Sequence, residues 1–201
     1  MKKHLMALLL LVSLLCTVLS GCGDGSAEQT PEDRAQANTI NVGIAQDLDE
    51  SLDPHKTVKA GTREVMFNVF EGLMKPTSNG DLTPAVAESY TVSDDHRTYT
   101  FTLREGVKFH NGDAVTAEDV IYSIQRCIAP AETGIVPVEA FSIITDIQAL
   151  DERTVAITIS EPSNEFISYL TTAILPADYE EQDTAPVGTG PFRFVSRTAQ
   201  D

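Results

Sequence analysis

The stretch TYTFTLREGVKFHNGD, residues 98–113, decides the fold of this 201-residue chain. Its first six residues alternate threonines with larger apolar side chains, which predicts a half-buried β-strand. The larger side chains are those of Tyr99, Phe101 and Leu103. Residues 90–92 precede this strand across a polar turn at residues 93–97, so the two segments together predict a β-hairpin.

A helix is predicted to follow this hairpin. Residues 111–113, NGD, suit a turn, and Thr116-Ala-Glu-Asp119 is a variant of the capping box with Asp in place of Glu. The apolar stripe of the helix is formed by Val120, Ile121, Ile124 and Ile128. Next along the chain, the sequence predicts a second hairpin (residues 143–150 and 154–159) and a short helix (residues 164–170).

Before the first hairpin, the sequence predicts a helix at about residues 61–75, which ends at Pro76. Its apolar face has three- and four-residue spacing and is formed by Val65, Met66, Val69, Phe70 and Leu73. Two single strands are predicted at the flanks, residues 40–44 and residues 192–195, the latter after a turn at 188–191. Hairpins mixed with segregated helices favour the α+β (mixed α/β) class.

The first residues are typical of a secretion signal. Lys2 and Lys3 precede an apolar run from residue 5 to residue 19, which is shorter than the roughly 20 residues that a membrane span needs. Leu19-Ser20-Gly21-Cys22 resembles the lipobox of bacterial lipoproteins, in which the cysteine is acylated and becomes the first mature residue. We therefore expect a lipoprotein signal peptide at 1–21 and lipid attachment at Cys22, with a flexible tether at 22–38 that lacks aromatic residues.

The net charge of the chain disfavours nucleic acid as a partner. The chain has 14 basic and 30 acidic residues and a net charge of −16, so binding to nucleic acid through basic patches is disfavoured.

No catalytic or metal centre is expected. His55, His96 and His110 lie in separate turns without the ligand spacing of a zinc motif, and no serine sits in a nucleophile elbow. Cys127 lies among isoleucines, which favours a small buried hydrophobic residue over a reactive thiol. We therefore expect no catalytic residues, no metal and no cofactor.

Several stretches together resemble one family. Residues 68–74 (NVFEGLM), the block from residue 87 to residue 120, and residues 186–192 (PVGTGPF) are similar to family-5 extracellular solute-binding proteins, the peptide and nickel receptors of ABC importers. The order and spacing of these motifs agree from about residue 39 to residue 195. The lipobox fits as well, because such receptors are commonly lipid-anchored.

The resemblance implies a two-lobed receptor that resembles periplasmic binding proteins and closes on its ligand by a hinge motion. Residues 39–201 would form part of lobe one, with an added subdomain at about 61–185, and the chain would be the N-terminal portion of such a receptor. The implied partners are a peptide or small-molecule ligand, an ABC importer permease, and a membrane reached through the lipid anchor. The protein would be a monomer located outside the cytoplasm, on the outer face of the cytoplasmic membrane or the periplasmic side.

The resemblance also implies two ligand-contacting segments. The loop at Asp47, Leu48 and Asp49 corresponds to a loop that lines the cleft, and Thr171 and Thr172 fall where some relatives contact ligand. Ordinary loop and helix-end packing would explain both segments equally well. The acidic loop would suit a peptide amine.

Three functions follow from these observations. The leading hypothesis is a lipid-anchored receptor, most naturally for oligopeptides, that binds without catalysis, with nickel chelates and other small solutes as open alternatives. The second is a truncated product that serves as a surface interaction module or is inactive. An extracytoplasmic enzyme is a third, and it would need a nucleophile or metal cluster.

Overall fold

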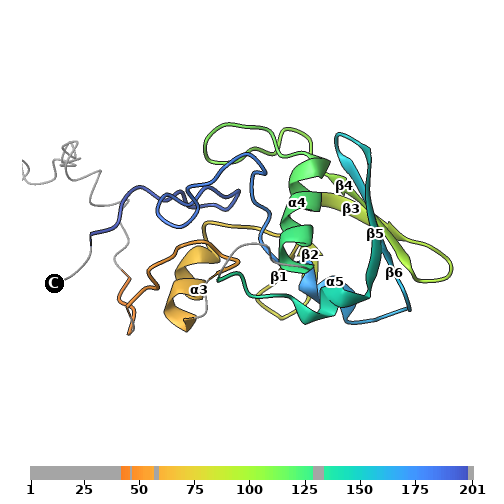
Figure 1. Cartoon of the computed structure of the whole chain (residues 1–201), viewed down its shortest axis with the longest axis horizontal. Helices are drawn as coiled ribbons and strands as arrows, with labels where there is room; N and C mark the ends of the chain where they lie inside the picture. Colours follow the sequence, from red (N-terminus) through yellow and green to blue (C-terminus); the bar gives the residue numbers. More distant parts are fainter. Residues whose placement is uncertain (1–41, 46, 57–58, 129–133, 199–201) are drawn as a thin grey trace, which may run out of the picture. The chain divides into compact units, whose positions relative to one another are not determined.

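The computed structural model describes residues 42–45, 47–56, 59–128 and 134–198 (Figure 1). The chain divides into two units, Met1–Gly43 and Ile44–Asp201, and every described helix and strand belongs to the second. The expected signal peptide, Cys22 and the tether lie outside the described residues. Within the described residues, no helix is long and apolar enough to cross a membrane.

A four-stranded antiparallel sheet has the order β3-β4-β6-β5. Its strands are β3 (Ala87–Val92), β4 (Thr98–Leu103), β6 (Thr154–Ile159) and β5 (Ile144–Asp151). Both predicted hairpins are confirmed. Along β4 the threonines are half-buried while Tyr99, Phe101 and Leu103 are buried, as the alternation predicts. Pairing of Phe101 with Val155 continues the buried face across the two hairpins.

Helix α4 (Ala117–Ile128) packs against β5 and β6 (Figure 1). The predicted capping box is formed at its start: the Thr116 N–H donates to Asp119 Oδ2 at 2.8 Å, and the Asp119 N–H approaches Thr116 Oγ1 at 3.4 Å. The 3-10 helix η1 (Glu139–Ile143) and the short helix α5 (Phe166–Tyr169) complete this core. They contribute Phe141 and Phe166, whose ring centroids lie 6.3 Å apart.

The predicted long helix is wrong in its extent. Helix α3 runs only over Ala60–Met66, and the chain then enters strand β1 (Met74–Pro76), which pairs with β2 (Leu82–Pro84). Four of the five predicted stripe residues are nevertheless buried, namely Met66, Val69, Phe70 and Leu73. The helix does not continue to residue 75 because the backbone of residues 72–74 forms hydrogen bonds with segments that are distant in sequence. The Val86 N–H donates to Gly72 O at 3.0 Å, and the Met74 N–H donates to Leu170 O at 3.1 Å.

The two predicted flanking strands are also wrong over the described residues. Residues 42–44 and 192–195 have no strand structure, and residues 40 and 41 lie outside the described part. Val42 and Val195 are 77% and 82% exposed, so the apolar alternation there is not matched by a buried face. A strand also needs a ladder partner, and the Phe192 N–H donates instead to Asn68 O in a turn.

Three glycines bring backbones together around residues 68–72. A Cβ on Gly72 would lie 2.5 Å from Leu170 O, one on Gly188 would lie 2.2 Å from Val69 O, and one on Gly190 would lie 2.4 Å from Asn68 O. Each of these neighbours is backbone, so it cannot move aside as a flexible side chain could. The turn at residues 188–191 is therefore a close backbone contact that only glycine permits.

We expect Gly188→Ala to destabilise the fold by about 1–3 kcal/mol or more, because the added methyl group must push two backbone segments apart. Gly43→Ala is the matched control, since a Cβ there meets nothing within 4 Å, and its unfolding free energy should stay within about 0.5 kcal/mol of the parent. Urea unfolding followed by circular dichroism measures both. Equal midpoints for the two variants would contradict the close contact.

Cys127 is buried on α4, as its isoleucine neighbours predict. Burial raises the pKa of its thiol to about 12, so the thiolate is scarce at neutral pH. An ordinary thiol has a pKa of about 8.5, and the difference lowers the thiolate fraction at pH 8 by roughly a thousandfold.

In the folded chain at pH 8, we expect iodoacetamide to modify Cys127 at less than about 1% of its rate in denaturing urea. Mass spectrometry of the peptide that contains Cys127 reports this residue separately from the other cysteines. Alkylation at similar rates in the folded and unfolded chain would show that the thiol is accessible and ionised.

Candidate functional site

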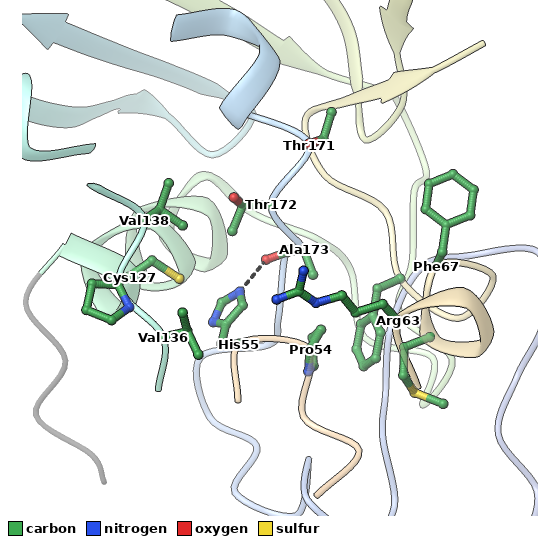
Figure 2. Close-up of a pocket in the computed structure, with 13 residues that line it drawn as sticks. Pro54, His55, Arg63, Phe67, Cys127, Val136, Val138, Thr171, Thr172 and Ala173 are labelled. Carbon is green, nitrogen blue, oxygen red and sulfur yellow. Dashed lines mark hydrogen bonds between the residues drawn. The ribbon is translucent and has the colours of Figure 1, made fainter. Parts of the chain in front are cut away.

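A cavity of about 380 Å³ lies beside α3 and the turn at residues 54–56 (Figure 2). Its volume falls in the range typical of small-molecule sites. The lining residues combine apolar side chains with a few polar ones. They are Pro54, His55, Arg63, Met66, Phe67, Phe70, Cys127, Val136, Pro137, Val138, Thr171, Thr172 and Ala173.

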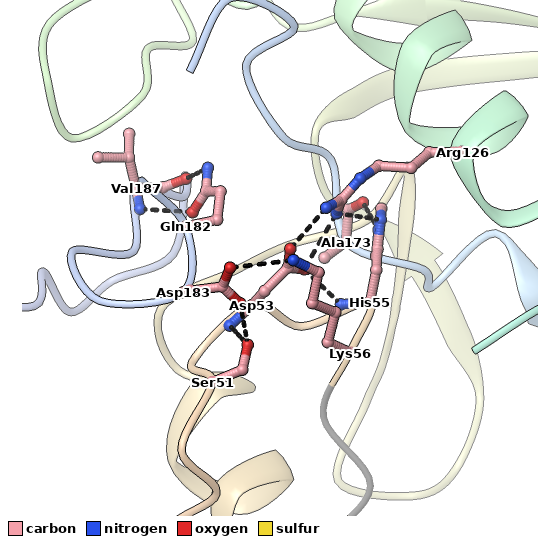
Figure 3. Close-up of polar contacts among 9 residues, drawn as sticks. All are labelled: Ser51, Asp53, His55, Lys56, Arg126, Ala173, Gln182, Asp183 and Val187. Carbon is pink, nitrogen blue, oxygen red and sulfur yellow. Dashed lines mark hydrogen bonds and ion pairs between the residues drawn. The ribbon is translucent and has the colours of Figure 1, made fainter. Parts of the chain in front are cut away.

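A buried ion pair holds the wall of this cavity in place (Figure 3). Arg126 of α4 donates to both carboxylate oxygens of Asp53, from Nη2 at 2.7 Å and from Nη1 at 3.0 Å. The two side chains are 8% and 1% exposed, so this forked pair is almost fully shielded from water. The pair joins the loop before α3 to α4, across 73 residues of sequence.

His55 connects the same loop to two more segments. Its ring Nε2 lies 2.9 Å from the carbonyl oxygen of Ala173, which can only accept a hydrogen bond. Its Nδ1 lies 3.2 Å from Arg126 Nη1, which can only donate. These bonds assign a neutral ring with the proton on Nε2. The His55 backbone carbonyl accepts the Val136 N–H at 2.9 Å, so one residue holds two walls of the cavity.

A second polar contact, at Asp183, holds the loop that contains Ser51 and Lys56. Asp183 accepts hydrogen bonds from the Ser51 hydroxyl and from Lys56 Nζ, the latter at 2.9 Å. The Ser51 hydrogen bond, with Lys56 adding to it, lowers the pKa of the Asp183 carboxyl. Gln182 in turn exchanges two hydrogen bonds with the backbone of Val187 (Figure 3).

The structure brings two of the predicted ligand residues into the cavity. Thr171 and Thr172 lie on its wall, where their hydroxyls donate to the carbonyls of Ser168 and Tyr169 at 2.9 Å and 2.7 Å. Each hydroxyl oxygen keeps lone pairs that can accept from a ligand.

The other three predicted residues lie elsewhere. Asp49 forms hydrogen bonds with the start of α3. Its N–H donates to Thr62 Oγ1 at 2.7 Å, and its carboxylate accepts the Lys59 N–H at 3.0 Å. Leu48 packs on the apolar cluster around Leu52. Asp47 precedes them in the same loop and does not line the cavity.

Sequence reasoning missed two residues that line the cavity, Arg63 on α3 and Phe67 at the C-cap of the same helix. Phe67 is 59% exposed. Phe67 is a large aromatic residue outside the predicted buried stripe, and this position in the sequence could have indicated that it faces a cavity. Asp53, His55 and Arg126 carried no such signal, since their association depends on the fold.

The described chemistry suits binding. Among the described residues, no three of the His, Cys, Asp and Glu side chains gather as a metal site requires. The two ring nitrogens of His55 are engaged, and the raised pKa of Cys127 keeps its thiol protonated. The described lining residues therefore present apolar side chains and the hydroxyl groups of Thr171 and Thr172 to the cavity.

The sequence matches the family described as "Bacterial extracellular solute-binding proteins, family 5 Middle" over residues 81–201. The glutathione-binding protein GsiB of Escherichia coli O6:K15:H31 (strain 536 / UPEC) is 35% identical over 166 residues, which are 79% of this chain and 32% of GsiB. Two solved structures are also similar. One is the binding protein AgaA of Agrobacterium tumefaciens in complex with agropinic acid (36% identity, TM-score 0.66, 76% of this chain and 32% of AgaA).

The other is DppA of Helicobacter pylori in complex with the peptide STSA (29% identity, TM-score 0.65, 74% of this chain and 35% of DppA). The chain spans about a third of the length of these relatives. The resemblance found in the sequence motifs and the expected α+β class are both confirmed. The chain belongs to the bacterial extracellular solute-binding proteins of family 5.

Proposed function

We propose that this chain is a solute-binding receptor of an ABC importer and that it takes short peptides without altering them. The observation that carries the proposal is the cavity at Thr171 and Thr172, in a chain that belongs to this family. GsiB is a glutathione-binding protein, and DppA was solved with a tetrapeptide, so both relatives support a peptide-like solute.

The cavity has features that a short peptide requires. Apolar side chains such as Phe67 and Val136 can pack against the side chains of a peptide, and the threonine oxygens can accept its N–H groups. The shielded pair of Asp53 with Arg126 keeps the wall in one arrangement before a solute arrives, which lowers the cost of ordering on binding.

The partners and location form the rest of the proposal. The receptor is a monomer that delivers its solute to a permease in the membrane. It works outside the cytoplasm and is held to the membrane by lipid on Cys22, since two acyl chains are sufficient for stable anchoring.

We expect the chain to bind glutathione or the peptide STSA with a dissociation constant of about 1 mM. The affinity is expected to be weak because a cavity of about 380 Å³ is near the small end of small-molecule sites, so part of a peptide would stay in solvent. Saturation-transfer NMR, which detects weak binding from the ligand signals, measures it. No saturable signal from either peptide, or from a wider peptide set, at up to about 20 mM would contradict the proposed function.

A matched pair of variants locates the binding. Phe67→Ala removes an aromatic side chain from the cavity wall and should weaken binding about fivefold, since burying part of a phenylalanine contributes about 1 kcal/mol. Phe192→Ala is the control, because Phe192 is 60% exposed, as Phe67 is at 59%, and does not line the cavity. Equal losses in both variants would place the binding elsewhere.

We expect Cys22→Ser to lose its lipid and leave the membrane fraction, because the acylated thiol is then absent. Cys16→Ser is the matched control, since Cys16 lies inside the expected signal peptide and should not affect lipidation. Metabolic labelling with palmitate followed by fractionation of the cells tests both. Undiminished label in the Cys22→Ser variant would rule out the lipobox.

A further inference from the structure

A second, smaller cavity adjoins the candidate site at Phe67. Its volume is about 180 Å³, against about 380 Å³ for the cavity of the candidate site, here called the first cavity. The two cavities share Phe67, Phe70 and Thr171 in their walls. In Figure 2, Phe67 and Cys127 lie at opposite ends of the first cavity, so the second cavity continues from the end at Phe67. A solute that extends past Phe67 can therefore reach it.

The wall of the second cavity is built from three segments that backbone hydrogen bonds hold together. Residues 67–76 supply most of the lining, and Thr171 and Pro191 come from distant segments. The residues on both sides of Pro191 donate their backbone N–H groups to the carbonyls of residues 68 and 69, at 3.1 Å and 2.9 Å. The cavity is therefore formed before a solute arrives, which lowers the cost of ordering on binding.

The lining of the second cavity suits one phenyl group. Its surface is mostly apolar, and the apolar residues are Phe67, Phe70, Met74, Pro76 and Pro191. An apolar cavity of about 150 Å³ is large enough to bind benzene, so a cavity of about 180 Å³ can hold a ring of that size. The thioether sulfur of a methionine also makes favourable contacts with aromatic rings.

The charged residues of this wall are paired. Glu71 and Lys75 both line the second cavity, and Lys75 Nζ donates to Glu71 Oε1 at 3.1 Å. The other carboxylate oxygen of Glu71 accepts from Arg104 Nη2 at 3.3 Å. The Glu71 side chain is 12% exposed, so a charged group of the solute would have to disturb one of these contacts. The wall therefore favours an uncharged side chain.

We propose that the second cavity is a subsite for one phenyl-sized apolar side chain of the solute, while the remainder of the solute occupies the first cavity. This inference rests on the proposed function, because it assumes that a peptide binds in the first cavity. Phe67 lines both cavities and contacts both parts of the solute. The receptor therefore selects, among short peptides, those that carry an aromatic residue.

The first test compares two peptides that differ in one side chain. Trialanine and the same peptide with phenylalanine at its middle position are titrated at pH 7 against the whole chain in mild detergent, by saturation-transfer NMR. The parent chain should bind the phenylalanine peptide about tenfold more tightly, because the second cavity removes its phenyl group from water.

A matched pair of variants tests whether the second cavity causes this preference. Asn68 is exposed and lines the second cavity but not the first, so Asn68→Trp should fill part of it. This variant should bind the two peptides within about twofold of each other, with its affinity for trialanine unchanged. Asn79→Trp is the control, because Asn79 is exposed in the turn between β1 and β2, outside both cavities, and should keep the tenfold preference. The same preference in both variants would place the phenyl group elsewhere.

The methyl signals of two methionines separate this inference from the proposed function. Met66 lines the first cavity and Met74 lines the second. In the unmutated chain, toluene should shift the NMR signal of the Met74 methyl group in a saturable manner, and the phenylalanine peptide should shift both methyl signals. If toluene shifts the Met74 signal while no peptide binds, the subsite stands and the peptide function fails. If the two peptides bind equally to the parent chain, or if toluene leaves the Met74 signal unchanged, the subsite is overturned.

Discussion

The shielded ion pair between Asp53 and Arg126 is the contact on which the candidate site depends. It joins a loop before α3 to a helix in the middle of the chain, and it fixes the position of His55 between them. His55 then bonds the Ala173 carbonyl on one side and receives the Val136 N–H on the other. Three walls of the cavity therefore meet at one polar cluster.

Such a pair fixes structure more than it adds stability. Removing water from two charges is costly, and their attraction repays that cost only where the geometry is good and the remaining donors are satisfied. Loss of one partner leaves a buried charge alone, which typically costs about 3–5 kcal/mol. The chain therefore resists any other arrangement of this loop, and the cavity keeps its shape without a solute.

Local pattern predicted the parts of the fold that local interactions decide. Both hairpins and the capped start of α4 follow from alternation, turn residues and the box at Thr116 and Asp119, and all were confirmed. The end of α3 could not be predicted this way. Its apolar spacing continues to Leu73, but the backbone around Gly72 pairs with residues 86 and 170, which are distant in sequence. The apolar spacing reports burial correctly there, while the backbone conformation is set by those partners.

The same distinction applies to the site. The resemblance to the family led to Thr171 and Thr172, whereas Asp53 and Arg126 meet across 73 residues that no local pattern spans. The flanking strands failed for a related reason, because alternation near Val42 and Val195 predicts a buried face that no neighbouring strand supplies over the described residues. The local sequence pattern therefore predicts where helices and strands lie along the chain, whereas contacts between distant segments determine which residues come together in the site.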